Sequence, residues 1–260
     1  MNIEIVDPTR AEKFCTLFQH IKLFTNSVNI TFNKDQMYLQ TMDSTKVSVI
    51  EITLPNIWFD KYELVYDEPI NIGINSNTLF KVLSTRDKSQ LIKLHYDLEN
   101  NDNLYIHFLS GQTKMFDKHF NIPLLELDTE LVNIPDIESN ADITLSSTNF
   151  SEIINQLQLF GDTIEFKCTE EQIQLCSVST ELGKIMADIS IDDLNSYSII
   201  ENYTMHMSFS LNKLHNICMF NKIAKEVDIL LTDEYPMQIT YNLGLDNANL
   251  NFYLAPIINE

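Results

Sequence analysis

An internal repeat constrains the fold of this chain more than any other feature. The apolar positions of residues 14–39 recur at residues 150–175, at a constant offset of 136 and without a gap. Each segment begins with apolar residues at helical spacing and continues as two alternating stretches joined by a polar turn, NKDQ at 33–36 and TEEQ at 169–172. Because helix, strand, turn and strand recur in the same order and register, the sequence predicts a duplicated domain.

A second helical pattern follows in each half. Apolar positions within residues 72–83 match those within residues 207–218 at an offset of 135, and alternating strand patterns flank both. The halves also end alike, in alternating stretches at 102–109 and 247–254. We therefore predict an α+β chain of two similar domains, each with two short helices packed on antiparallel sheets.

A connector separates the two halves. Its sequence, NIPLLELDTELVNIPDIES, is bounded by two prolines and rich in acidic residues. Such a composition is typical of an extended segment. The predicted organisation is a first domain at 1–120, a connector at 121–139 and a second domain at 140–260.

The distribution of charge decides whether the chain could bind nucleic acid. The formal net charge of −20, from 17 Lys and Arg against 37 Asp and Glu, argues against such binding unless the few cations share one face. About half of them lie on or beside three of the four predicted helices, whose apolar faces must cover sheets and whose polar faces therefore share one side. The residues of this candidate basic surface are Arg10, Lys13, His20, Lys81, Arg86, Lys213, Lys222 and Lys225. The third helix, predicted at 147–160, carries no cation, so we expect the first half to hold most of the positive charge.

No catalytic or metal-binding pattern stands out. The four cysteines show no CxxC spacing, and the histidines at 95, 107, 119, 206 and 215 form no HExxH motif. The acidic turn at 97–103 lacks the mid-loop Gly and the closing Glu of an EF-hand, and the chain has only five glycines. We therefore predict a protein that is not an enzyme and needs no metal or cofactor; a metal-dependent hydrolase is the least favoured alternative.

Targeting segments are not expected either. The start, MNIEIVDPTR, lacks the basic and apolar regions of a signal peptide, and no apolar run approaches the roughly 18 residues of a membrane span. We expect an intracellular protein whose cysteines are reduced, buried thiols.

The stretch FYLAPI, residues 252–257, predicts a surface that needs a partner. Pro256 cannot donate to a sheet ladder and restricts the residue before it. The strand should therefore end near Leu254, leaving Ala255, Pro256 and Ile257 along a surface. Apolar residues there need a covering segment, from this chain or from another one.

Four stretches resemble the proliferating cell nuclear antigen family, the eukaryotic sliding clamps. LQTMDSTKVSVIEITL at 39–54 is similar to the family's "LQ-MDSSHVSLV" hallmark, and LLELDTELVNIP at 124–135 looks like its interdomain connecting loop. FGDTIEF at 160–166 corresponds to its "IGD" strand start, and FYLAPI matches its C-terminal "YYLAPKI". The likeness runs in order over essentially the whole chain.

The resemblance implies a DNA polymerase processivity factor. It implies a homotrimeric ring that encircles double-stranded DNA without sequence preference, with the helices and Lys114 facing the duplex. It also implies a pocket that captures peptides of polymerases, clamp loaders, ligases and nucleases, in the nucleus or at a viral replication site. The alternatives are a subunit of a heterotrimeric checkpoint-type clamp and a monomeric viral processivity factor.

The resemblance also assigns residues to two further sites. The residues assigned to the peptide pocket are Met42, Lys46, Val47, Val132, Ile134, Pro135, Tyr235, Pro236, Tyr253, Leu254, Ala255, Pro256 and Ile257. The residues assigned to the trimer interface are Thr113, Met115, Phe116, Lys118, Gly183, Ile185 and Met186. Three departures stand out: Lys46 replaces a typical histidine, the third helix lacks the family's basic residues, and the stretch at 117–123 is two residues longer than usual.

Overall fold

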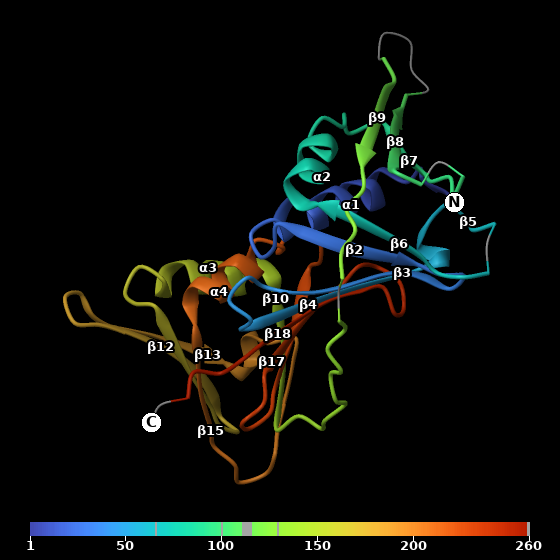
Figure 1. Cartoon of the computed structure of the whole chain (residues 1–260). Helices are drawn as coiled ribbons and strands as arrows, with labels where there is room; N and C mark the ends of the chain where they lie inside the picture. The colour runs from blue at the N-terminus through green and yellow to red at the C-terminus, as the bar shows by residue number, and fades with distance from the viewer. Residues whose placement is uncertain (66, 100, 111–115, 129, 259–260) are drawn as a thin grey trace. The chain divides into compact units, whose positions relative to one another are not determined.

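The chain divides into two α+β units (Figure 1). A computed structural model describes residues 1–65, 67–99, 101–110, 116–128 and 130–258. By their contacts, the first unit contains residues 1–44, 51–132 and 245–249, and the second contains residues 45–50, 133–244 and 250 onward. Each unit therefore consists of one long stretch of the chain and shorter stretches from elsewhere in the sequence.

The first unit contains two helices and most of nine strands among its described residues. In chain order these are β1 (Asn2–Ile5), α1 (Pro8–Ile21), β2 (Ser27–Phe32), β3 (Gln36–Met42), β4 (Ser48–Pro55), β5 (Lys61–Glu63), β6 (Ile70–Asn75), α2 (Ser76–Leu83), β7 (Leu91–His95), β8 (Asn103–Leu109) and β9 (Lys118–Pro123). A short 3-10 turn, Asn56–Trp58, follows β4, whose first residues belong to the second unit.

The second unit repeats this pattern. Its elements are β10 (Ala141–Ser146), α3 (Ser147–Leu157), β11 (Thr163–Cys168), β12 (Gln172–Ser179), β13 (Gly183–Ser190), β14 (Ser196–Ile199), β15 (Met205–Ser210), α4 (Leu211–Cys218), β16 (Glu226–Leu231), β17 (Met237–Asn242) and β18 (Asn249–Leu254). The 3-10 turn Ile191–Asp193 lies between β13 and β14. None of the helices in the described residues is long and apolar enough to span a membrane.

The sheets of the two units have the same topology. In the first unit the strand orders are β5-β1-β7-β8-β9 and β4-β3-β2-β6, and in the second they are β14-β10-β16-β17-β18 and β13-β12-β11-β15. The duplicated α+β fold predicted from the sequence is therefore confirmed. One detail is wrong: the sequence matched β8 with β18, whereas the topology matches β8 with β17 and β9 with β18.

Each strand that precedes α2 or α3 also starts that helix. Asn75 ends β6 and caps α2, where its side chain accepts a hydrogen bond from the N–H of Thr78 at 3.0 Å. Ser146 ends β10 and caps α3 in the same way through the N–H of Asn149. Because a capping side chain satisfies a backbone donor that lacks a helical partner, these residues fix where strand becomes helix.

The helices cover sheets with the apolar faces that the repeat predicted. Phe14, Leu17 and Phe18 of α1 are buried, as are Phe150 and Leu157 of α3. Within each unit the two helices pack against each other, α1 on α2 and α3 on α4. The polar faces of both pairs are therefore left on the side away from the sheets.

Candidate functional site

The C-terminal segment lies along the surface of the second unit. Strand β18 ends at the buried Leu254, as the sequence predicted. The Ala255 N–H donates to the carbonyl of Val47 at 3.0 Å, and the Ile257 N–H donates to the carbonyl of Ser208 at 2.7 Å. Pro256, which has no N–H to donate, stands between these two anchors, so the proline leaves no backbone donor unpaired.

A hollow opens beside this segment. A cavity of about 730 Å³ is bordered by Pro256, Ile257 and Ile258, with Phe166 and Met207 from neighbouring strands. Three carboxylate side chains also line this cavity, and they belong to Glu165, Asp233 and Glu234. The cavity therefore offers apolar contact next to negative charge.

Three exposed apolar residues of the same unit belong to the C-terminal segment or to its surroundings. Val47 accepts the hydrogen bond from Ala255, and Tyr235 follows Glu234, which borders the same cavity as Ile257. The exposed fraction is 36 % for Val47, 45 % for Tyr235 and 38 % for Ile257. Lys46, which precedes Val47, adopts a positive φ of 59°, a left-handed conformation that is uncommon for a residue with a side chain. These residues have the exposure that a peptide-binding surface needs, and their assignment to the pocket remains a prediction.

The other assigned pocket residues differ in accessibility. Ile134 and Tyr253 are half-buried, Pro135 and Pro236 are exposed, and Leu254 is buried. In the first unit, Met42 and Val132 are exposed by 38 % and 37 %. Leu254 is therefore a supporting residue, since a fully covered side chain offers no contact to a ligand.

The part of the connector that belongs to the first unit, which ends at Val132, is anchored near both of its ends. The Leu124 N–H donates to the Asp102 carbonyl at 2.9 Å, and the Leu125 N–H donates to the Gly73 carbonyl at 2.8 Å. At the far end, the Gln40 side chain donates to the Val132 carbonyl at 3.0 Å and accepts from the Val132 N–H at 2.7 Å. Gln40 is only 8 % exposed, so these two bonds satisfy a buried amide.

Gly73 is needed for the first anchor. A Cβ atom at this position would lie 2.1 Å from the Leu125 carbonyl oxygen. We expect Gly73→Ala to destabilise the chain by about 1–3 kcal/mol, because the connector backbone must move. Denaturant unfolding measures this change, and hydrogen exchange should rise at Leu124 and Leu125. Asn71→Ala, at an exposed position of the same strand, removes one hydrogen bond from the Thr31 hydroxyl and should cost less than about 1 kcal/mol; equal destabilisation by the two variants would refute the close approach.

Arg10, a predicted DNA contact, is engaged within the first unit. Its guanidinium donates to Asp60 Oδ1 at 2.7 Å and to the Trp58 carbonyl at 2.5 Å. Burial by itself would raise the pKa of the Asp60 carboxyl, but hydrogen bonds from the Val6 and Asp7 N–H groups and the charge of Arg10 outweigh it and lower that pKa. Arg10 therefore holds β1, α1 and the loop after β4 together.

Arg86 is held even more firmly. Its side chain is 2 % exposed, and it donates to the carbonyls of Gln90 and Lys88 and to the Glu12 carboxylate at 3.3 Å. Lys13 is half-buried, and this burial lowers its pKa. Both arginines of the first half are engaged by other groups of the first unit. The first half therefore has less positive charge available for DNA than the sequence predicted.

The remaining predicted cations differ in exposure. Lys81 on α2, and Lys222 and Lys225 after α4, are exposed. Lys213 and His20 are half-buried and both have interaction partners. Lys114 lies outside the described residues. The side chains best placed to meet a phosphate are therefore Lys81, Lys222 and Lys225.

Two of the strands that end the described sheets, β13 and β9, hold residues assigned to the trimer interface. β13 is last in the order β13-β12-β11-β15, and β9 is last in the order β5-β1-β7-β8-β9. No residue of β13 is fully buried, and Leu182 and Met186 beside and within it are 65 % and 48 % exposed. A long edge with exposed apolar side chains is a typical site for pairing with another chain.

The predicted interface residues fall unevenly on these edges. Gly183, Ile185 and Met186 all lie in β13. In the first unit only Lys118 lies in β9; Phe116 precedes it with 76 % exposure. Thr113 and Met115 are outside the described residues. The described open edge of the first unit is thus 118–123.

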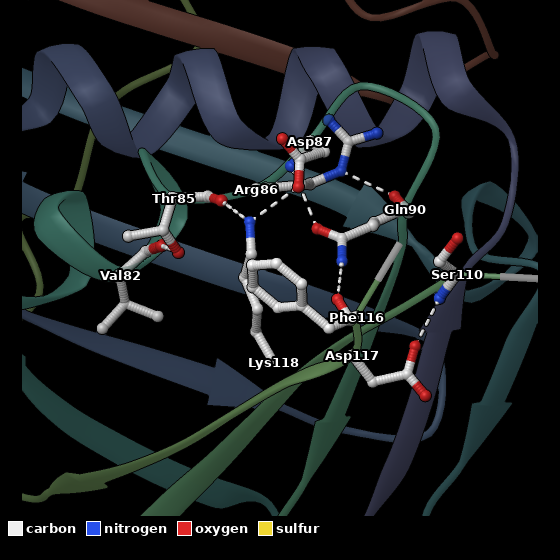
Figure 2. A network of polar contacts seen from close by, with 9 residues as sticks. All are labelled: Val82, Thr85, Arg86, Asp87, Gln90, Ser110, Phe116, Asp117 and Lys118. Atoms are coloured by element: carbon white, nitrogen blue, oxygen red, sulfur yellow. Dashed lines mark hydrogen bonds and ion pairs between the residues drawn. The ribbon is translucent and has the colours of Figure 1, made fainter. Parts of the chain in front are cut away.

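The loop after α2 holds the start of β9 in place (Figure 2). Lys118 donates to the Asp87 carboxylate at 2.7 Å and also to the Thr85 carbonyl. The buried Gln90 side chain donates to the Phe116 carbonyl at 3.0 Å and accepts from the Asp87 N–H. This network fixes the position from which the edge strand begins.

Sequence reasoning missed Gln40, Gly73 and Gln90. Gly73 carried a usable signal, because a glycine inside a strand pattern often marks a close backbone approach. Gln40 stands beside Leu39 at a buried position, inside the LQTMDST stretch that carries the family resemblance. Nothing local to Gln90 points to its partner 26 residues away.

The cysteines show no sign of redox or nucleophilic chemistry. All four are free; Cys168, Cys176 and Cys218 are buried and Cys15 is half-buried. Burial raises the pKa of Cys15 to about 11 and that of Cys168 to about 12. These two thiols therefore stay protonated near neutral pH and are poor nucleophiles.

Comparison with protein-family models gives two matches. The model of the proliferating cell nuclear antigen N-terminal domain matches residues 9–131, and the model of the C-terminal domain of the same protein matches residues 133–257. The two matches are consecutive and meet at Val132, the residue that Gln40 holds.

Proposed function

The chain belongs to the proliferating cell nuclear antigen family of DNA sliding clamps, and from this premise we propose that three copies form a closed ring around duplex DNA. The ring is a processivity factor: it tethers replication and repair enzymes to DNA through a peptide-binding pocket. The observation that carries the proposal is that, in each of the two repeated domains, a strand that holds predicted interface residues ends its sheet: β9 in the first unit and β13 in the second.

These two end strands suggest how copies of the chain join. β9 is hydrogen-bonded to β8 on one side, and β13 is hydrogen-bonded to β12 on one side. Each strand is the last of its sheet, so its other side is available to a further strand. β9 of one copy can therefore pair with β13 of the next. Such a head-to-tail contact forms a ring when its rotation closes.

A ring reconciles the acidic chain with DNA binding. An enclosed duplex cannot leave without ring opening, so weak and sequence-independent phosphate contacts are enough. The exposed Lys81, Lys222 and Lys225 supply such contacts in three copies. The acidic remainder of the surface repels DNA and favours the enclosed position.

The pocket takes a short peptide segment of each partner. An aromatic and aliphatic plug contacts the exposed apolar side chains beside Ala255–Ile257, and the connector forms one border. The partners are polymerases, clamp loaders, ligases and nucleases. The chain itself acts as a non-enzymatic scaffold, in the nucleus or at the replication site of a DNA virus.

Light scattering of the purified chain tests the assembly. A mass of about three times 30.1 kDa supports the homotrimer. A mass of one chain rejects it and favours a monomeric processivity factor or a clamp that needs different partner subunits. The second outcome would fit the absence of cations on α3.

Reversing the exposed lysines tests the DNA-facing surface. We expect Lys222→Glu with Lys225→Glu to weaken binding to a short duplex at low salt. The slope of log K against log salt should become shallower by about 0.9 for each phosphate that the variant no longer neutralises. Fluorescence anisotropy measures both quantities. Lys34→Glu with Lys167→Glu changes the net charge equally at other exposed positions and should alter the slope little; equal effects of the two pairs would reject the placement.

A further inference from the structure

Two histidines meet on the outer face of the five-stranded sheet. His107 on β8 and His119 on β9 are directly opposite each other in the strand register. Their Nδ1 atoms are 2.7 Å apart, and the ring centroids are 4.8 Å apart with planes inclined by 64°. Ile106 and Phe108 point into the core, so both imidazoles lie on the side that faces away from it.

Two nitrogens this close can share a proton or a metal ion. Metal–nitrogen bonds of about 2.05 Å at a right angle place the two nitrogens about 2.9 Å apart. The observed 2.7 Å is close to that separation. The torsion that turns an imidazole ring is broad, so small rotations of the two rings open the space for an ion.

Other polar side chains of the sheet lie around His107. Lys93 is opposite His107 on β7, and its ammonium pairs with the Glu4 carboxylate at 3.1 Å. His95 is two residues further along β7, and its ring centroid lies 6.0 Å from that of Tyr105, with the ring planes inclined by 47°. Burial, His119, Lys93 and His95, in that order, lower the pKa of His107. The neutral form of imidazole is the one that binds metals.

We propose that His107 and His119 form a two-histidine site for Ni²⁺ or Cu²⁺, late first-row divalent cations that bind nitrogen ligands at right angles. Imidazole nitrogen suits these ions, and affinity should be highest for Cu²⁺. The described residues contain no group of three or more His, Cys, Asp or Glu side chains arranged for a metal, so water completes the coordination. Motif spacing along the chain misses this pair, because strand pairing brings the two residues together across 12 positions. His119 lies on β9, the strand that the proposed ring pairs with the next copy, but both ligands belong to one chain, so the site needs no second copy.

Calorimetric titration of the whole chain with NiCl₂ at pH 7.5 tests the proposal. We expect one ion per chain, and His119→Gln and His107→Gln should each weaken binding about 100-fold or more, since the second ligand acts at high effective concentration. His206→Gln, an exposed strand histidine of the second unit, is the matched control and should bind as the unchanged chain does. Absence of binding, or full binding by His119→Gln, overturns the proposal.

Thermal unfolding gives a second readout that does not depend on the heat of metal binding. Because the ion binds only the folded pair of strands, NiCl₂ should raise the melting temperature of the unchanged chain and of His206→Gln, but not that of His119→Gln. At pH 5 protons compete for the imidazoles and the increase should vanish. An equal increase in His119→Gln, or an increase that persists at pH 5, contradicts the site.

Discussion

Replacing Met186 with proline is expected to convert the assembled protein into single chains. Met186 lies in β13, which ends its sheet, and 48 % of the residue is exposed. Proline has no N–H and its ring disturbs the strand beside it, so pairing on the outer side of β13 is abolished or weakened. Light scattering should then give 30.1 kDa instead of about three times that mass.

Companion variants separate a failure to assemble from a failure to fold. Neighbouring N–H groups of a strand point to opposite sides, so one of Ile185→Pro and Met186→Pro removes a bond to β12 and the other removes a bond to an outer partner. Met186→Lys keeps every N–H and places a charge on the edge. Ser198→Pro, on the end strand β14, is the control and should leave the mass unchanged. If all three β13 variants stay folded and trimeric, β13 is not the interface.

The order and limits of the elements were predictable because they depend on local periodicity. β2 and β11 begin 136 residues apart and have equal lengths, and α2 and α4 begin 135 residues apart, as the sequence offsets required. The helix predicted at 147–160 ends three residues earlier, at Leu157. Its last predicted turn carries Leu159, whose side chain is 71 % exposed, so no burial extends the helix.

Strand partners were less predictable, since period-two alternation says which face of a strand is buried but not which strand lies beside it. The sequence therefore matched β8 with β18, although β9 holds the equivalent place at the end of its sheet. The partners of the cations were hidden for the same reason. Asp60 and Glu12, which engage Arg10 and Arg86, lie 50 and 74 residues away along the chain.

The candidate peptide surface has one feature that the sequence indicated and two anchors that it could not indicate. Residues 252–257 already indicated a strand end and an exposed apolar segment, because proline fixes where a ladder stops. The two anchors of the connector could not be found in this way. Gly73 and Gln40 act through backbone atoms of Leu125 and Val132, and a backbone contact leaves no residue-type signal at its partner.

Replacing Ile134 with aspartate is expected to abolish peptide binding while leaving assembly intact. Ile134 is half-buried, lies two residues after Val132, which Gln40 anchors, and belongs to the surface assigned to an apolar plug. An unpaired carboxylate there must be desolvated when the peptide binds, at a cost of about 2–4 kcal/mol, which corresponds to an affinity weaker by about 30-fold to 1,000-fold. Calorimetry with a synthetic peptide that carries an aliphatic residue followed by two aromatic residues measures this change.

Two further variants test whether the loss of peptide affinity is specific to Ile134 and whether it depends on the anchoring of the connector. Ile137→Asp makes the same substitution three residues further along the connector, at a side chain that is 37 % exposed, and should alter affinity less than about threefold if the contact is local to Ile134. Gln40→Ala removes both bonds to Val132 without adding a charge, so a partial decrease in affinity is expected, because the released connector must be ordered when the peptide binds. Undiminished binding by Ile134→Asp would place the peptide elsewhere. Equal decreases in Ile134→Asp and Ile137→Asp would show that the peptide responds to connector charge in general, and the apolar pocket would then not be its binding site.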